Sequence, residues 1–172
     1  MKSIFMSQGT KLFIILSLLL LCVTLPAFAQ EVPTVEGSIG YSGIRSNGEY
    51  INGFSANAGY NALRTKGATL GGEFEFAGFY ENGAHLHTFQ LGPIAQFGTK
   101  DVRFFGRSLF GGARVSANGF ANNIFGGTIG GGVKIPFGEY FHGRVGIDWV
   151  FFRNAGQQVN GAKVTVGIGF GK

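Results

Sequence analysis

The chain has 172 residues, and 31 of them are glycine, about 18% against a usual share of roughly 7%. Charged residues make up only 13% and hydrophobic residues 45%, which excludes a disordered polyelectrolyte, because disorder needs low hydrophobicity and high net charge. Collagen is excluded, because the glycines show no three-residue period and the chain has only 4 prolines. A helical bundle is disfavoured, because glycine destabilises helix interiors. Abundant glycine with 19 phenylalanines favours a protein built of β-strands.

The N-terminal segment has the pattern of a cleaved export signal, and we predict a signal peptide over residues 1–29. Lys2 and Lys11 supply its positive charge. Residues 12–25 form an apolar run of about 14 residues, shorter than the roughly 20 that a membrane-spanning helix needs. The sequence Ala27-Phe28-Ala29 then matches the small-residue site that signal peptidase cleaves.

Cleavage leaves a mature chain of residues 30–172, which we expect to form a single exported domain. Its basic residues fall from 14 to 12 against 9 acidic residues, because both lysines of the signal are removed. The remaining basic residues are scattered, so the sequence gives little support to nucleic-acid binding. The single cysteine, Cys22, also leaves with the signal, so disulfides cannot stabilise the mature chain.

Short turn-like segments divide the mature chain into eight stretches of roughly 9–15 residues. Three of them contain Asn-Gly, at Asn47-Gly48, Asn82-Gly83 and Asn118-Gly119, a strong hairpin signal because both residues tolerate positive φ. The other turns are expected at 65–67, 98–101, 137–139 and 154–156. Because every connection is short, each strand is expected to pair with its neighbour in sequence, which makes an up-and-down meander.

Apolar and polar residues alternate along most of these stretches, as in a strand with one apolar and one polar face. In the second stretch Phe54, Ala56 and Tyr60 alternate with Asn57 and Asn61. The same alternation recurs in the stretches that contain Val35, Leu70, Ile129, Ile147 and Val166.

Two stretches have a less regular pattern. Pro93 lies inside the stretch 85–97, where proline removes a ladder hydrogen bond, and Ile94 falls on its polar face. In the stretch 102–115 basic and apolar residues share one phase: Arg103, Phe105, Arg107 and Leu109. A bulge could switch the phase of this strand.

Alternating strands can close into two kinds of barrel. A soluble lipocalin-like barrel points its apolar face inward to bind an apolar ligand, whereas an outer-membrane barrel points this face toward lipid. Three features favour the membrane barrel. The polar face is rich in small residues such as Gly71 and Gly130, it carries few lysines and glutamates, and aromatic residues such as Tyr41 and Phe97 lie near the ends of the stretches.

Several stretches also match a known architecture: residues 35–41, 109–114, 130–133 and 144–149, and the closing strand to Phe170. Over residues 31–172 the sequence resembles the small eight-stranded outer-membrane β-barrel proteins related to the OmpA-type transmembrane domain. The resemblance implies an eight-stranded barrel in the bacterial outer membrane. Such barrels often end on an aromatic residue, whereas here Gly171 and Lys172 follow Phe170.

Charged residues on the polar face suggest how the interior is filled. Glu73 and Glu75 share the inward phase with Arg144 and Asp148, which lie on the opposite side of an eight-stranded barrel. With Arg107, they are expected to form a buried ion-pair network that plugs the lumen. The alternative is a gated polar channel, in which the pairs break to pass ions.

A catalytic site has weak support in the sequence. His85, His87, Thr88 and Glu81 could in principle perform acyl transfer, but threonine is a poor substitute for serine and the histidines lie on the lipid-side phase. The two histidines lack a third metal ligand. His142 is expected in a turn, without a partner. External loops of roughly four to eight residues are shorter than those a receptor or adhesin displays.

We therefore predict an all-β, eight-stranded antiparallel up-and-down transmembrane β-barrel in the bacterial outer membrane, preceded by a cleaved signal peptide. The predicted function is a structural or interaction role without catalysis, with a plugged polar interior and no cofactor or metal. The expected partners are outer-membrane lipid and, during biogenesis, the barrel-assembly machinery, and the barrel is expected to be a monomer. The alternatives are a lipocalin-like binder of apolar ligands, a narrow ion channel and a lipid-modifying outer-membrane enzyme.

Overall fold

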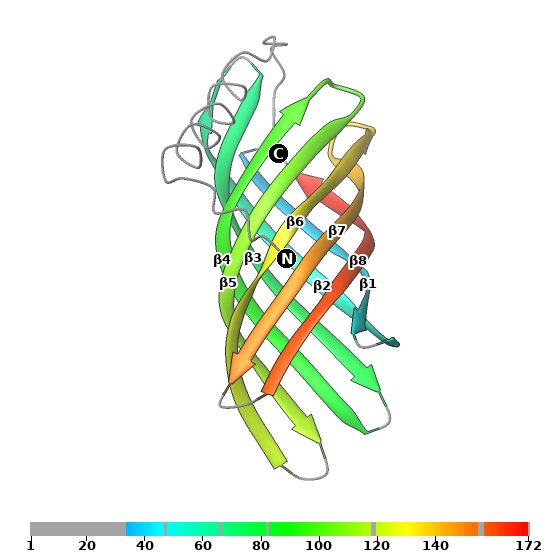
Figure 1. Cartoon of the computed structure of the whole chain (residues 1–172). Helices are drawn as coiled ribbons and strands as arrows, with labels where there is room; N and C mark the ends of the chain where they lie inside the picture. Colours follow the sequence, from blue (N-terminus) through cyan, green and yellow to red (C-terminus); the bar gives the residue numbers. More distant parts are fainter. Residues whose placement is uncertain are drawn as a thin grey trace, which may run out of the picture.

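The chain forms a closed barrel of eight antiparallel strands (Figure 1). The computed structural model describes residues 34–171 apart from 47, 66, 82, 118, 119, 155 and 156, so the predicted signal peptide lies outside the described residues. No described helix is long and apolar enough to cross a membrane. The strands are β1 (Val35–Ser46), β2 (Glu49–Arg64), β3 (Ala68–Glu81), β4 (Ala84–Gly98), β5 (Arg103–Ala117), β6 (Phe120–Phe137), β7 (Phe141–Asn154) and β8 (Gln157–Gly171).

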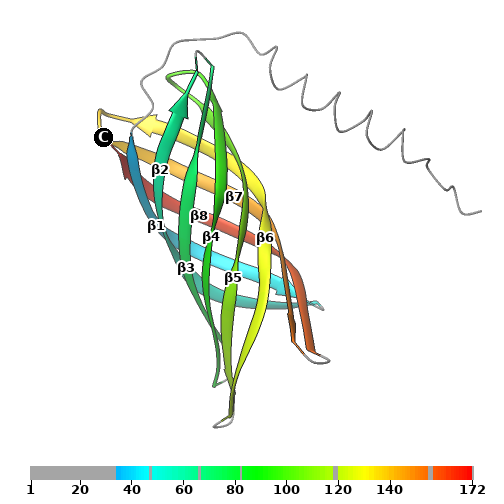
Figure 2. The ribbon, with the colours of Figure 1, turned by 90° about the vertical axis from the view of Figure 1, so that its left-hand side faces the viewer.

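Every strand pairs with its neighbour in sequence, and β1 also pairs with β8, so the ring has no free edge. The predicted eight-stranded up-and-down topology is confirmed. Both ends of the described chain lie at one end of the barrel, where Glu36 is paired with Gly171 (Figure 2). We call this end the terminal end and the opposite end the distal end.

The four connections at the distal end are tight hairpins, with two residues between the strands. Gly48 and Gly83 have φ angles of 91° and 79°, as expected for Asn-Gly hairpins. These connections are shorter than the four to eight residues expected from the sequence. The β5–β6 hairpin reaches furthest along the barrel axis (Figures 1 and 2).

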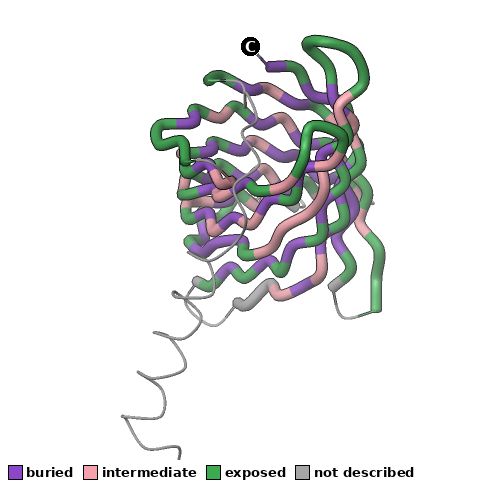
Figure 3. Tube along the Cα trace, turned by 90° about the horizontal axis from the view of Figure 1, so that it is seen from above, coloured by how far each residue is buried: buried purple, intermediate pink, exposed green. Residues whose placement is uncertain are grey.

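Buried and exposed residues alternate along the strands (Figure 3). Most of the described large hydrophobic side chains point outward, and Phe125 and Ile147 are 66% and 64% exposed. Charged side chains point into the lumen, where Glu73 and Asp148 are each only 2% exposed. A soluble protein has the opposite arrangement, because unpaired charges are costly to bury.

Strands β4 and β5 each keep one phase. The β4–β5 ladder is interrupted at Gly92 and Pro93 and resumes in the same register at Ile94, because proline has no N–H to donate. In β5 the buried residues are Arg103, Phe105, Arg107, Leu109 and Ala113, which all share the inward phase. The phase switch considered for β5 therefore does not occur, and its apolar residues share the lumen with its arginines.

Glycine permits close approach between strands β6 and β7. A Cβ added at Gly126 would lie 1.9 Å from the carbonyl oxygen of Phe151, and one at Gly130 would lie 2.5 Å from the Cα of Asp148. No real Cβ tolerates such distances from backbone atoms. Glycine at these positions thus lets the wall curve tightly around a narrow lumen.

Candidate functional site

The lumen is the candidate site, and its side chains fill it in three layers. At the terminal end lies a polar layer that we call the terminal group: Glu36, Gln96, Arg103 and Lys134. In the middle lies the central ion cluster: Glu73, Glu75, Arg107, Arg144, Asp148 and Lys163. Toward the distal end lies the distal apolar core: Ile44, Ala77, Phe79, Leu86, Ala113, Ile124, Val150 and Phe152.

Arg107 on β5 is the hub of the central ion cluster. Its guanidinium donates to Glu73 at 2.5 Å and to Glu75 at 2.8 Å, both on β3. It also forms a two-point contact with Asp148 on β7, at 2.6 and 3.1 Å, and donates to the side-chain oxygen of Asn57 at 3.0 Å. One cation therefore contacts three carboxylates and an amide from three strands, an arrangement that the fork of donors on arginine permits.

Arg144 and Lys163 complete the central ion cluster. Arg144 donates to both carboxylate oxygens of Glu73, at 2.8 and 2.9 Å. Lys163 donates to Glu75 at 2.5 Å and lies 3.5 Å from Asp148. The cluster thus contains three acids and three bases, so its charges balance. The five side chains named from the sequence, Glu73, Glu75, Arg107, Arg144 and Asp148, all belong to it.

The terminal group is organised around Glu36 of β1. The carboxylate accepts one hydrogen bond from Arg103 at 3.1 Å, one from Lys134 and one from Gln96 at 3.2 Å. Gln96 also donates to Asn61 at 2.9 Å. The partners of Glu36 thus come from β4, β5 and β6, and Gln96 extends the network to β2, so the terminal group connects β1 with strands across the lumen.

Phe105 separates the terminal group from the central ion cluster. The Arg144 guanidinium lies 4.4 Å from the centre of its ring, and the Lys134 ammonium lies 5.7 Å away. Both distances are within the range of a cation–π contact. An inward phenylalanine therefore contacts cations from both layers.

Sequence reasoning missed four charged members of the lumen: Glu36, Arg103, Lys134 and Lys163. Each lies on the inward phase of its own strand, so applying the same two-residue alternation to every charged residue would have found them. Pairing β3 with β7 alone does not include them, whereas the structure pairs charges across most of the ring.

His142 also lies in the lumen, which corrects its expected place in a turn. Strand β7 begins at Phe141, so the next residue already points inward. The His142 side chain is 2% exposed, and its ring occupies the space beside Gly169 on β8, where an added Cβ would lie 2.2 Å from Nε2. No described residue offers this Nε2 a hydrogen-bond partner.

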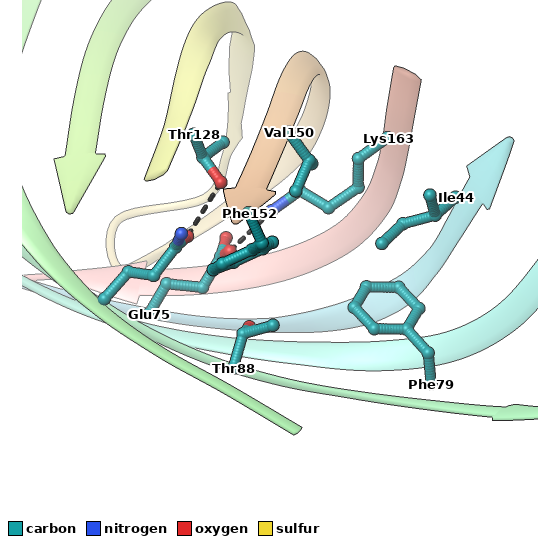
Figure 4. Close-up of a pocket in the computed structure, with 9 residues that line it drawn as sticks. Ile44, Glu75, Phe79, Thr88, Thr128, Val150, Phe152 and Lys163 are labelled. Carbon is teal, nitrogen blue, oxygen red and sulfur yellow. Dashed lines mark hydrogen bonds and ion pairs between the residues drawn. The ribbon is translucent and has the colours of Figure 1, made fainter. Parts of the chain in front are cut away.

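The distal apolar core departs from the expected polar interior. Figure 4 shows Phe79, Phe152, Ile44 and Val150 beside the Glu75–Lys163 ion pair. The space between these side chains has no volume that can hold a water molecule. The inward phase therefore changes from polar to apolar toward the distal end, and the side chains at this change are tightly packed.

The residues considered for acyl transfer do not assemble. His85 and His87 lie on the outer surface, where His87 Nε2 is 3.1 Å from the Tyr80 hydroxyl. The Thr88 side chain points into the lumen and is 3% exposed, so the barrel wall separates it from the histidines. No group of three or more metal-binding side chains occurs among the described residues.

Comparison with known proteins identifies the fold. No family model and no curated protein matches the sequence. Among solved structures, the N-terminal β-barrel domain of OprF from Pseudomonas aeruginosa is 18% identical, with a TM-score of 0.56, over 81% of this chain and 98% of that domain.

Two further barrels agree with this likeness. Ail, the attachment invasion locus protein of Yersinia pestis, is 17% identical over 81% of this chain and 99% of its own, with a TM-score of 0.56. Neisserial surface protein A is 17% identical over 79% of this chain and 93% of its own, with a TM-score of 0.54. The chain therefore has the fold of small eight-stranded outer-membrane β-barrels.

Proposed function

We propose that the protein is an integral β-barrel of the bacterial outer membrane with a closed interior and a structural or interaction role that involves no catalysis. The observation that carries the proposal is the inverted distribution of side chains, with paired charges inside and most of the described large hydrophobic residues outside. We further propose that it works as a monomer in contact with outer-membrane lipid, after insertion by the barrel-assembly machinery.

Physical chemistry supports the membrane location. Lipid cannot satisfy backbone N–H and C=O groups, so a sheet that spans it must close without an edge, as this one does. Outward residues such as Ile39, Leu91 and Ile147 are more than 60% exposed, and contact with acyl chains would remove them from water. A lipocalin-like binder has less support, because the side chains where the distal apolar core meets the central ion cluster leave no room for water.

The membrane location is tested by extraction and by gel migration. Expressed with its leader in a Gram-negative host, the protein is expected to require detergent for release and to migrate differently on SDS gels before and after boiling. A closed barrel resists SDS until heat opens it. Release by osmotic shock without detergent would instead support a soluble binder.

The closed interior is tested in planar bilayers with the wild type and Arg144→Met. Removal of this cation disturbs the central ion cluster and leaves Phe79 and Phe152 in place. Both proteins are therefore expected to be silent. Arg153→Met, a change of the same chemistry at an exposed outward position, serves as the control. New conductance in Arg144→Met alone would contradict the plug and favour the gated channel.

A further inference from the structure

The buried charges of the described lumen do not balance, and the excess lies at the terminal end. Three carboxylates match three cations in the central ion cluster. In the terminal group the single carboxylate of Glu36 faces both Arg103 and Lys134. A buried charge without a counter-charge is unfavourable, so this layer has an unmet need for one negative charge.

Two buried nitrogens at this end also have no partner among the described residues: Nε of Arg103 and Nε2 of His142. Glu36 is already occupied, because its two oxygens accept from Arg103, Lys134 and Gln96. Arginine Nε always carries a proton, and histidine Nε2 carries one in the appropriate tautomer. Both nitrogens can therefore donate to an added acceptor.

Strand register places these groups close together. Arg103 on β5 is paired directly with Lys134 on β6, which is paired in turn with Arg144 on β7. His142 is the next inward position on β7 and lies nearer the terminal end. Directly paired residues have Cβ atoms about 5 Å apart, so the cations and the imidazole line one side of the lumen.

The terminal group lies at the end of the charged lumen, where two of its side chains keep slight solvent exposure while Lys134 and His142 are only 1% and 2% exposed. The side chains of Arg103 and Glu36 each keep 7% exposure, whereas no charged side chain of the central ion cluster exceeds 4%. On the distal side Phe105 and the central ion cluster close the path. A small solute could therefore approach the terminal group from the end of the barrel that carries the chain termini.

We propose that the terminal end of the lumen is a binding site for a small soluble oxyanion such as phosphate, with Arg103, Lys134 and His142 as its donors. The anion supplies the missing negative charge and accepts from the two unpartnered nitrogens. Guanidinium and ammonium groups are the usual protein ligands of such anions. The site follows from the lumen geometry alone and goes beyond the proposed function, since a closed structural barrel needs no ligand.

The test titrates the folded mature protein in zwitterionic detergent with inorganic phosphate, at fixed pH and ionic strength with chloride as the balancing salt. Phosphate is expected to raise the thermal midpoint in a saturable manner, because a ligand that binds only the folded state stabilises it. Arg103→Gln is expected to weaken binding at least tenfold, and Glu36→Gln to strengthen it several-fold by removing the competing carboxylate. Arg153→Gln, the same change at an exposed position, is expected to bind like the wild type.

Several results would overturn the proposal. Equal stabilisation by chloride, or equal phosphate binding by Arg103→Gln and the wild type, would show general screening in place of a site. If Arg103→Gln does not fold, Arg103→Lys replaces it, because lysine keeps the charge but lacks Nε. Phosphate binding by Arg103→Lys as tight as that of the wild type would also contradict the proposal. A parallel titration adds an anionic phospholipid to the micelles, and stabilisation by the lipid with none by phosphate would exclude a soluble anion.

Discussion

At the scale of single residues, the most consequential side chain is Arg107. Its guanidinium is the shared partner of Glu73, Glu75 and Asp148, three carboxylates that would repel one another without it. Lys163 and Arg144 neutralise part of this charge but approach from the other side of the ring. The stability of the interior therefore depends on one cation more than on any single ion pair.

Replacing Arg107 with methionine is expected to cost about 3–5 kcal/mol of unfolding free energy, because it leaves buried carboxylates without their main partner. Urea unfolding in phospholipid vesicles measures the loss. Arg114→Met on the same strand removes an exposed, outward arginine and is expected to change stability by no more than about 0.5 kcal/mol. Adding Glu73→Gln to Arg107→Met should recover part of the lost unfolding free energy. Equal losses of stability in Arg107→Met and Arg114→Met would contradict the central role of Arg107.

At the scale of elements, each strand presents different chemistry along its inward face. Strand β3 carries Glu73 and Glu75 in the middle of the barrel and then Ala77 and Phe79 toward the distal end. Strand β7 repeats this order with Asp148, Val150 and then Phe152. The layers of the lumen arise because β3 and β7, on opposite sides of the ring, both change from polar to apolar toward the distal end.

The distal apolar core gives a prediction for one of these strands. Phe79→Ala is expected to destabilise the barrel by about 3–5 kcal/mol, because a rigid ring of strands cannot collapse into the cavity. Phe74→Ala on the outward face of the same strand is expected to cost less, since mobile acyl chains fill the space. Denaturant midpoints in lipid vesicles compare the two, and a larger loss for Phe74→Ala would contradict the closed core.

Strand positions and the direction of most side chains could be predicted because alternation is a local property. Ser55 and Asn57 reveal the phase of β2 without knowledge of any other strand. In β5 this rule was indecisive, because Phe105 and Leu109 share the inward phase with arginines. Only the three-dimensional filling of the lumen shows that apolar and basic side chains both fit there.

The partners of the charged residues could not be predicted in the same way. Lys163 meets Glu75 from 88 positions away in the chain, and Lys134 meets Glu36 from 98 positions away. Such contacts depend on the stagger that accumulates from strand to strand around the ring. No local pattern in the sequence records that stagger, so alternation can place Glu36, Arg103 and Lys134 in the lumen but cannot pair them with one another.

At the scale of the whole molecule, the proposed membrane location makes the outer wall sensitive to charge. Ile147 lies near the middle of β7 and is 64% exposed. Ile147→Arg is expected to cost about 2–4 kcal/mol in a bilayer, because the cation would enter the hydrocarbon region. Ile147→Val, which changes the side chain at the same position without adding a charge, serves as the control. Unfolding in vesicles gives the values, and an unchanged stability for Ile147→Arg would indicate a wall that faces water.

The ion pairs of the lumen also constrain how the molecule can be assembled. Among the described ion pairs, Lys163–Asp148 alone joins adjacent strands, at 3.5 Å, whereas Glu73–Arg144 and Glu36–Arg103 join strands on opposite sides. A sheet with only some of its strands paired would thus expose charged side chains without counter-charges to any hydrocarbon that it entered. Contacts of Glu36 on β1 and Lys163 on β8 with their distant partners depend on closure of the ring, so sealing the seam between these two strands also completes the neutralisation of the interior.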